Sequence, residues 1–401
     1  MARNGLRRFV ILAAAVTLVA GAAAVTTAAP EPAVAAAVEL TPPAPTGSHP
    51  VGVTEVHFVD AGRVDPWAGG DRELMVQIWY PAEDSGSSEP AAWMPAGGRE
   101  AQRDYLDGLG VPARSWRFGP SHSYPNRPAR QGIGRFPVLL NSPGMTDTTG
   151  WSTAQAEDLA SHGYVVVAMN HTHEAFAVHF PDGRVERTVV PLDSPPEVLS
   201  DVLLPNRVAD TRFVLAELAD AAAGGSTAAA LPAELAANLD LTRVGMFGHS
   251  LGGSTTVQAL HDEPGIRAGV NLDGPVLGSV ADEGTDKPLL MLAGGRSPWY
   301  GQPGWEPFWS NNIGVKLPIG IAGTEHMSFC DQQVILPVLA AAGLLGAEAA
   351  GDAVGDIDAR RSVDLQRTYL RTFFDTVFAR EGGDILRAIT LLAQPEVVPH
   401  G

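Results

Sequence analysis

The stretch Val244-Gly245-Met246-Phe247-Gly248-His249-Ser250-Leu251-Gly252 places a serine between small residues, directly after a short apolar run. Residues 253–260 have a helical composition, so Ser250 is expected on a tight turn from a strand into a helix. Glycines flank such a serine because the turn is strained and neighbouring backbone passes too close for a Cβ atom. The pattern is typical of a nucleophile elbow, which exposes a reactive hydroxyl. The simpler alternative is a buried turn serine.

Eight apolar segments are predicted to be strands: residues 53–59, 73–80, 137–141, 164–169, 243–248, 268–273, 288–293 and 317–322. From the third onward they are apolar on both faces and are separated by helical stretches, which include residues 152–162, 207–221 and 362–380. Such alternation indicates a mostly parallel sheet flanked by helices on both faces, and the first two strands fit an antiparallel hairpin. With the serine turn after the fifth strand, the sequence predicts an α/β-hydrolase fold with an eight-stranded sheet.

The composition suits one large domain, since the chain has 401 residues of which 45% are hydrophobic. A formal net charge of −18 argues against a nucleic-acid partner, because phosphate binding requires clustered Lys and Arg. Cys330 is the only cysteine, so no intramolecular disulfide can form. We expect Cys330 to be a small buried apolar residue; the alternative is a reactive thiol.

The first 37 residues are expected to be a secretory signal peptide and processing region. Arg3, Arg7 and Arg8 precede an apolar stretch at residues 9–25, and small-residue cleavage sites follow. A secreted protein without a stable membrane anchor is therefore predicted, and the alternative is a retained N-terminal anchor. Residues 38–50, rich in Pro and Ala, are expected to be an unstructured linker, and residues 51–394 a single catalytic domain.

A serine nucleophile needs a histidine base, and in this fold the base follows the acid along the chain. Only His326 and His400 lie downstream of the expected acid, and His400 is in the C-terminal tail. His326 directly follows the last predicted strand, where catalytic loops are found. We therefore predict His326 as the base, against the alternative of a surface loop histidine.

The acid that orients this base is predicted to be Asp273, at the end of the strand after the nucleophile helix. Its competitors Asp282, Glu283 and Asp286 precede the next strand and so lie at the wrong end of the sheet. The alternative for Asp273 is a turn aspartate, since Gly-Pro follows it.

The oxyanion donors are expected to be two backbone N–H groups, one after the serine and one in the loop after the third strand. Leu251 and Met145 occupy these positions. Gly144 permits a tight turn towards the substrate, and Pro143, which has no N–H, is not one of the donors.

Three long segments are predicted to be loop insertions: residues 84–135, 191–206 and 296–318. The second could cover the site. The third carries Trp299, Tyr300, Trp305, Phe308 and Trp309. These aromatic side chains could line a substrate pocket, for which Trp299, Trp305 and Trp309 are the candidates, or pack as a satellite core.

A metal site is not expected. His171, His173, Glu174 and His179 have ligand-type side chains near the end of a strand, but no complementary carboxylate pair or further histidine cluster supports a site. Neither a metal nor a cofactor is required by the serine chemistry.

Several segments together resemble the secreted, plasma-type platelet-activating factor acetylhydrolases, from about residue 51 to the last helix. They are Asp158-Leu159-Ala160-Ser161-His162-Gly163-Tyr164-Val165-Val166, Arg207-Val208-Ala209-Asp210-Thr211-Arg212-Phe213-Val214-Leu215, the elbow, Leu272-Asp273 and His326. The resemblance implies Ser250 as nucleophile, Asp273 as acid, His326 as base, and Met145 and Leu251 as oxyanion donors. It also implies a calcium-independent esterase that removes short or oxidised acyl groups from phospholipids. Pro143 stands where the family often has a histidine.

The sequence thus predicts a secreted serine esterase that hydrolyses short-chain esters, with phospholipid sn-2 acetyl groups as one possible substrate. The alternative within the same chemistry is a broad carboxylesterase, lipase or polyester hydrolase, which would differ in its pocket. The alternative from another class is a catalytically silent binding protein of the same fold, which would lack a triad member.

Overall fold

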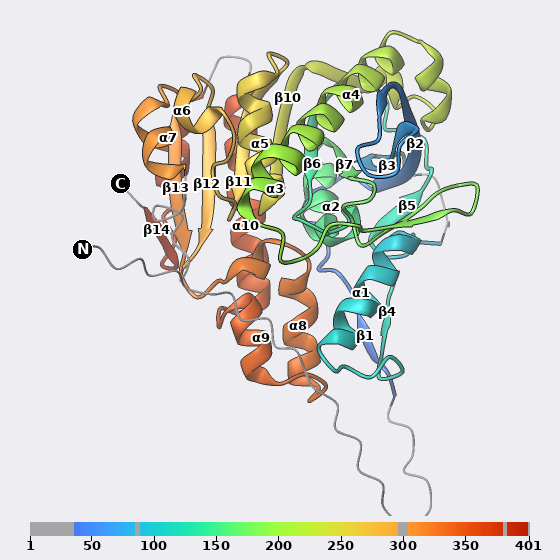
Figure 1. Cartoon of the computed structure of the whole chain (residues 1–401), viewed down its shortest axis with the longest axis vertical. Coiled ribbons are helices and arrows are strands. Elements are labelled where there is room, and N and C mark those ends of the chain that lie inside the picture. The colour runs from blue at the N-terminus through green and yellow to red at the C-terminus, as the bar shows by residue number, and fades with distance from the viewer. Residues whose placement is uncertain (1–35, 85–88, 296–303, 380–382, 400–401) are drawn as a thin grey trace, which may run out of the picture. The chain divides into compact units, whose positions relative to one another are not determined.

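Alternating strands and helices assemble into a ten-stranded, mostly parallel sheet (Figure 1). The computed structural model describes residues 36–84, 89–295, 304–379 and 383–399, and residues 37–401 form one compact unit. In spatial order the strands are β14 (Val397–Pro399), β13 (Lys316–Ile321), β12 (Leu289–Gly294), β11 (Ile266–Leu272), β10 (Leu239–His249), β6 (Phe136–Ser142), β7 (Val165–Asn170), β3 (Asp71–Pro81), β2 (Val51–Val64) and β5 (Ser123–Pro125).

The predicted strands are all present, and their expected directions are confirmed. The six strands β6, β7 and β10 to β13 pair in parallel, whereas β2 and β3 form an antiparallel hairpin. The expected number of strands was wrong, because β5 and β14 extend the two edges of the sheet. Each is only three residues long, and so short a segment shows no hydrophobic periodicity.

Helices occupy most of the connections between strands. They are α1 (Ala96–Gly108), α2 (Thr153–Ser161), α3 (Pro196–Val198), α4 (Leu204–Ala222), α5 (Leu251–Asp262), α6 (Val280–Glu283), α7 (Trp305–Asn311), α8 (Gln332–Ala341), α9 (Ala347–Val354), α10 (Ala359–Val377) and α11 (Ile385–Leu391). Short 3-10 helices are η1 (Thr149–Ser152), η3 (Ser226–Ala230), η4 (Ala236–Asn238) and η6 (His326–Phe329), and η2 (Leu199–Leu203) is a π-helix. No helix in these described ranges is long and apolar enough to span a bilayer.

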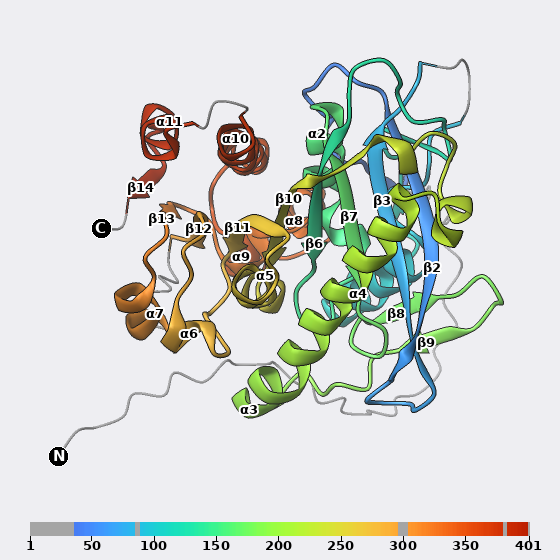
Figure 2. The ribbon, with the colours of Figure 1, turned by 90° about the horizontal axis from the view of Figure 1, so that it is seen from above.

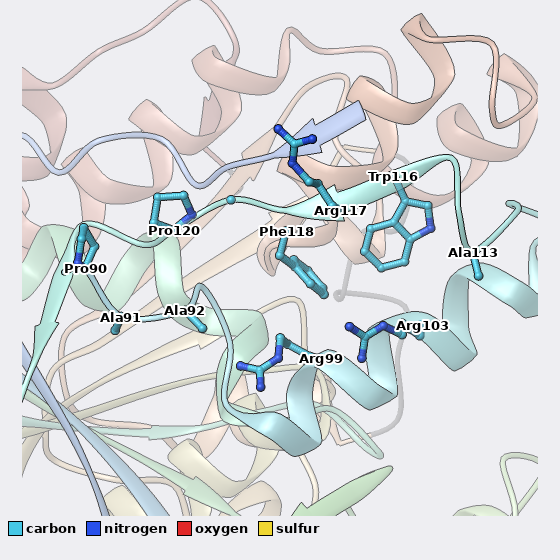
Figure 3. A pocket seen from close by; sticks show the side chains of 11 residues that line it. Pro90, Ala91, Ala92, Arg99, Arg103, Ala113, Trp116, Arg117, Phe118 and Pro120 are labelled. Carbon is cyan, nitrogen blue, oxygen red and sulfur yellow. The ribbon is translucent and has the colours of Figure 1, made fainter. Parts of the chain in front are cut away.

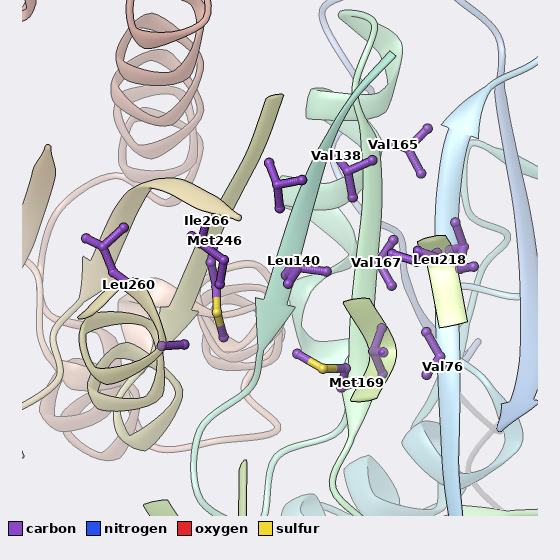
Figure 4. Close-up of a cluster of buried hydrophobic side chains, with 14 of the residues drawn as sticks. Val76, Val138, Leu140, Val165, Val167, Met169, Leu218, Met246, Leu260 and Ile266 are labelled. Atoms are coloured by element: carbon purple, nitrogen blue, oxygen red, sulfur yellow. The ribbon is translucent and has the colours of Figure 1, made fainter. Parts of the chain in front are cut away.

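The sheet packs between two apolar layers, one on each face. Each strand contributes to both layers because its successive side chains point to opposite faces. In β6, Val138 and Leu140 join a cluster with α4 and α5 (Figure 4). Leu139, between them, joins a second cluster with α2 and α10 on the other face. The helices of the two layers lie on opposite sides of the sheet (Figure 2). Burial on both faces explains why these strands read as continuous apolar runs.

The segment 38–50 is not an unstructured linker. Its first residues form β1 (Val38–Leu40), which pairs in parallel with β4 (Trp116–Phe118). Farther along, the Thr46 N–H donates to Asp158 Oδ1 at 2.7 Å, and the Gly47 N–H donates to Ser161 Oγ at 2.9 Å. The composition rich in Pro and Ala misled the prediction, because backbone groups of any residue type can pair with buried polar side chains.

The segments expected as loop insertions contain regular structure. Residues 84–135 include α1, β4 and β5, and residues 191–206 include α3, η2 and the start of α4. Outside these segments, β8 (Ala177–His179) and β9 (Val185–Arg187) form a two-stranded antiparallel sheet.

Residues 38–50 are expected to contribute to stability. A chain beginning at residue 51 would lose the bonds of Thr46 and Gly47, and the carbonyls of Pro43 and Ala44 that accept from the buried Arg367. Each buried polar group left unpaired costs about 1–3 kcal/mol. We expect its melting temperature to lie several degrees below that of a chain beginning at residue 37, measured by calorimetry. Equal melting temperatures would contradict this role.

Candidate active site

Ser250 lies on the turn between β10 and α5 with φ of +54°, a left-handed conformation that is costly for a non-glycine residue. The glycines around it are required by the backbone. A Cβ atom on Gly248 would overlap the carbonyl of Gly252, and one on Gly252 would overlap the carbonyl of Ser142 at the end of β6. The turn therefore brings the serine to the carboxyl edge of the sheet with its side chain directed outward.

The three predicted triad residues meet at this edge. His326 Nε2 lies 3.0 Å from Ser250 Oγ, and His326 Nδ1 lies 2.7 Å from Asp273 Oδ2. The second carboxylate oxygen of Asp273 accepts the N–H of Gly294 at 2.8 Å. The side chain of Asp273 is buried, whereas that of His326 is 47% exposed. This is the hydrogen-bonded order of a nucleophile, a base and an orienting acid.

The acid next to His326 shifts its titration. Desolvation by itself would lower the pKa of His326, but the hydrogen bond to Asp273 and the negative charge of that carboxylate outweigh it, so the pKa is raised. An imidazolium beside a buried carboxylate is thus favoured, which is the charge state a histidine base reaches after accepting a proton.

The competing acids lie elsewhere. Asp282 and Glu283 are in α6, Asp286 follows that helix before β12, and Glu283 pairs with His261 at 2.9 Å. The other downstream histidine, His400, lies outside the described residues.

The two expected oxyanion donors belong to the helix that follows the serine and to the loop after β6. Leu251 is the first residue of α5, where a helix leaves its N–H groups without intrahelical acceptors. Met145 follows Gly144 in the loop after β6. Phe176 N–H donates to the carbonyl of Thr146 at 2.8 Å and so ties this loop to the segment after β7.

Comparison with known proteins places the chain in a family. The sequence profile of "Platelet-activating factor acetylhydrolase, isoform II" matches residues 34–375. The chain belongs to this family. The resemblance expected from the sequence is thereby confirmed.

The relatives in this family are moderately similar. A protein of Arthroderma benhamiae named "Probable 1-alkyl-2-acetylglycerophosphocholine esterase" is 30% identical over 276 residues, and the match covers 65% of this chain and 65% of that protein, just under two thirds. The platelet-activating factor acetylhydrolase of Gallus gallus is 24% identical over 339 residues, covering 72% of this chain and 74% of the relative.

A solved structure is similar over most of the chain. The ferulic acid esterase of Streptomyces cinnamoneus has 31% sequence identity and a TM-score of 0.72, and the match covers 91% of this chain and all of that one. Together with the parallel sheet and the turn at Ser250, this confirms the predicted α/β-hydrolase fold.

An apolar cluster includes the side chains of Leu251 and Met145, the two residues predicted to supply the oxyanion donors. It consists of Val190, Leu203 and Leu251, with Trp67, Met145, Val198, Leu199 and Leu277 packed against it. Val198, Leu199 and Leu203 come from α3 and η2 within residues 191–206, and Val190 directly precedes this segment. This packing agrees with the expectation that residues 191–206 cover the site. The sequence did not identify the individual side chains, because α3 and η2 are too short to show a helical periodicity.

In the described part of the aromatic segment, residues 304–318, the aromatic side chains contribute mainly to the core. Trp305 and Phe308 of α7 are buried in the cluster beneath α4 and α5, and Trp309 packs against that cluster. Lys316 Nζ lies 4.3 Å from the ring centre of Trp309. For Trp305 and Trp309 the structure therefore favours the satellite-core alternative over a substrate pocket. Trp299 and Tyr300 lie outside the described residues.

A separate pocket of about 430 Å³ lies between α1 and β4 (Figure 3). Arg99 and Arg103 of α1 face Trp116 and Phe118 of β4 across it. Its lining includes none of the triad residues or oxyanion donors, so it is distinct from the site at Ser250.

The residues considered as metal ligands have other polar partners, and His173 Nδ1 lies 3.2 Å from Asp65 Oδ2. His171 contacts Asp210, Glu174 contacts Arg207, and His179 contacts Glu100. Within the described ranges, no group of three or more His, Cys, Asp or Glu side chains could hold a metal ion. Cys330 is buried, and burial raises the pKa of its thiol, which disfavours the reactive thiolate.

A histidine and an aspartate that the sequence analysis did not single out connect the two sides of the site. His249 Nδ1 lies 3.3 Å from Asp147 Oδ2, and its Nε2 lies 2.9 Å from the carbonyl oxygen of His326. Asp147 also accepts the N–H of Gly144 at 3.1 Å. The only sequence signal was their proximity to the elbow and to the loop after β6.

We expect His326 to titrate above the ordinary histidine value of about 6.5, because Asp273 stabilises its protonated form. Replacing Asp273 with Asn removes that charge and should lower the pKa of His326. Histidine ring NMR signals followed against pH measure both. Asp286→Asn is the control and should leave the titration unchanged. A His326 pKa below 6.5 in the unmodified protein would contradict the assignment.

Proposed function

We propose that this family member is a serine ester hydrolase that acts on short-chain carboxylic esters through an acyl-enzyme on Ser250. The observation that carries the proposal is the continuous chain from Ser250 Oγ through His326 to Asp273, with separations of 3.0 and 2.7 Å. The names of the relatives, a probable 1-alkyl-2-acetylglycerophosphocholine esterase, a platelet-activating factor acetylhydrolase and a ferulic acid esterase, support hydrolysis of carboxylic esters.

In the first half of the reaction, His326 Nε2 accepts the Ser250 proton as Oγ attacks the ester carbonyl. Asp273 stabilises the resulting imidazolium through the Nδ1 bond. The imidazolium then gives its proton to the departing alcohol, leaving the acyl group on Ser250. In the second half, His326 takes a proton from water as the water oxygen attacks the acyl carbonyl. The bond between the acyl group and Ser250 Oγ then breaks, the imidazolium returns its proton to Oγ, and the acid is released.

The negative charge that develops on the carbonyl oxygen would be held by the N–H groups of Met145 and Leu251. Removing one such donor typically costs about 10²–10³ in kcat. Leu251 adds the favourable field of the α5 N-terminus. The chemistry requires neither a metal nor a cofactor.

The acyl group is proposed to lie against the apolar cluster around Leu251 and Met145. Val198 of α3 and Leu199 and Leu203 of η2 contribute side chains to this cluster. We expect it to accommodate a short acyl chain. The names of the Arthroderma benhamiae and Gallus gallus relatives support the proposal that phospholipids with an sn-2 acetyl group are substrates of this chain. A lipase, a broad carboxylesterase or a polyester hydrolase would differ from this in the size of the pocket.

A second candidate substrate class is aromatic acyl esters. It is favoured by the ferulic acid esterase, which is 31% identical and matches along its whole length. Trp67 packs against the same cluster and offers an aromatic surface to such an acyl group.

A catalytically silent binding protein is less well supported. Such a protein would lack a nucleophile, base or acid, whereas Ser250 and Asp273 each lie within hydrogen-bonding distance of His326.

Secretion is proposed from the sequence alone. Arg3, Arg7 and Arg8 followed by the apolar residues 9–25 have the pattern of a cleaved signal peptide. The N-terminal residue of the exported protein, determined by mass spectrometry, distinguishes cleavage before about residue 38 from a retained anchor.

Replacement of Ser250 by Ala should abolish hydrolysis, with a loss on the order of 10⁶ in kcat, because no nucleophile remains. A fluorophosphonate probe should label the unmodified protein at Ser250 and should not label the variant. Asp273→Asn should cost about 10⁴ in kcat by leaving His326 in the wrong tautomer, and Asp286→Asn should be nearly silent. Persistent labelling of the Ser250 variant, or the reverse ranking of the two aspartates, would overturn the site.

Activity towards p-nitrophenyl esters is expected to peak at acetyl to butyryl and to fall sharply by palmitoyl. A deep tunnel would gain about 0.8 kcal/mol for each buried CH₂, so kcat/KM would rise with chain length, whereas a short pocket leaves further methylenes in water. Rates of hydrolysis of methyl ferulate and of a 2-acetyl phospholipid, measured at equal concentration, distinguish aromatic acyl esters from acetyl phospholipids as the preferred substrates. Rates that rise through C12 to C16, or that EDTA abolishes, would identify a lipase instead.

A further inference from the structure

Two sequence motifs remain unexplained by the triad: Arg207 and Asp210 on α4, and the segment from His171 to Glu174 after β7. The structure brings them together beneath the loop that carries Met145. Arg207, Glu174, His171 and Asp210 are all buried, with Arg207 only 1% exposed. Because Arg207 and Asp210 are three residues apart, they project from the same face of α4.

Arg207 binds the backbone of the oxyanion loop directly. Its Nη1 donates to the carbonyl of Pro143 at 2.6 Å, and its Nη2 donates to the carbonyl of Gly144 at 3.0 Å. Its Nε donates to Glu174 Oε2 at 2.7 Å, so the guanidinium is oriented from its other side by a fully buried carboxylate. The planar fork of an arginine holds two such acceptors in a fixed geometry.

The Gly144 carbonyl belongs to the same peptide unit as the Met145 N–H. A peptide unit is planar and trans, so its C=O and N–H point in opposite directions. Holding the carbonyl on the Arg207 side therefore aims the Met145 N–H to the opposite side. A charged donor on the carbonyl also polarises the peptide and strengthens its N–H as a donor.

The same loop is held at a second point. Asp147 Oδ2 accepts the N–H of Gly144 at 3.1 Å. Below it, His171 Nε2 lies 2.9 Å from Ser142 Oγ, and His171 Nδ1 lies 2.8 Å from Asp210 Oδ2. The peptide units on both sides of Gly144 are thus restrained by buried side chains.

We propose that Arg207, oriented by Glu174, is a positioning residue that aims and polarises the Met145 N–H of the oxyanion hole. This inference rests on the proposed function, since it concerns a donor for the oxyanion formed at Ser250. Arg207 acts through the peptide of Gly144 and Met145 and does not touch the substrate.

The test compares Arg207→Lys with the matched control Arg367→Lys. Arg367 is also buried and also donates to backbone carbonyls, those of Pro43, Ala44 and Ala154, away from the oxyanion loop. Both substitutions keep the positive charge and remove the planar guanidinium that binds two acceptors at once. Melting temperatures measure the structural cost that they share.

We expect Arg207→Lys to lower kcat for a p-nitrophenyl ester by about 10–100-fold, below the 10²–10³ cost of deleting an oxyanion donor outright, with KM changed less than about twofold. The inhibition constant of a trifluoromethyl ketone, whose adduct with Ser250 carries an oxyanion, should rise by a similar factor. Arg367→Lys should change kcat less than about threefold. Equal kcat losses in both variants, or a higher KM at unchanged kcat, would overturn the proposal.

If Arg207→Lys does not fold, Glu174→Gln tests the same positioning role. This substitution keeps the side-chain size and removes the charge that orients Arg207. A tenfold or larger loss of kcat with unchanged KM, accompanied by weaker trifluoromethyl ketone binding, supports the positioning role. A loss below threefold overturns it. An unmodified protein that binds no fluorophosphonate and hydrolyses no ester would instead refute the proposed function itself.

Discussion

The close contact between the end of β6 and the turn after β10 is the constraint on which the site depends. The two strands are parallel neighbours, and their register sets Gly248 beside Ser142. At Gly252 no side chain fits, because the carbonyl of Ser142 occupies its place. This contact sets the loop after β6, which carries Met145, against the N-terminus of α5, which carries Leu251. Without this contact, no neighbouring strand would hold the strained turn at Ser250 in place.

Buried charged side chains lie around this contact. They favour one arrangement of the surrounding segments, and their desolvation costs free energy. Burial by itself would raise the pKa of Asp210, but the charge of Arg72 and the bond to His171 lower it well below the ordinary range. Arg72 donates to Asp210 and Asp65, and it is fully buried. Loss of one partner from such a pair typically costs about 3–5 kcal/mol, since an unpaired charge stays behind. Because His171 joins Asp210 to Ser142 at the end of β6, arrangements of the loop after β6 that break these bonds would leave buried charges unpaired.

Much of the site could be predicted from the sequence because its signals are local. The elbow needs glycines at fixed spacing, Asp273 and His326 each follow an apolar strand, and the order of serine, acid and base along the chain is that of the fold. The strands of the central sheet were predictable for the same reason, since burial on both faces leaves continuous apolar runs. The edge strands β5 and β14 were not, because three residues carry no periodicity.

The sequence by itself determined the fold class, the central strands and the candidate triad, because each depends on residue types within a few positions of one another. Only the tertiary structure decided that Arg207 meets Glu174 and the oxyanion loop, that Trp305 packs in the core, and that residues 38–50 lie along Asp158 and Ser161. These contacts join segments up to 114 residues apart. A polar side chain has many chemically equivalent partners, and which one it meets is settled by how the helices pack on the sheet, a property that no local pattern encodes.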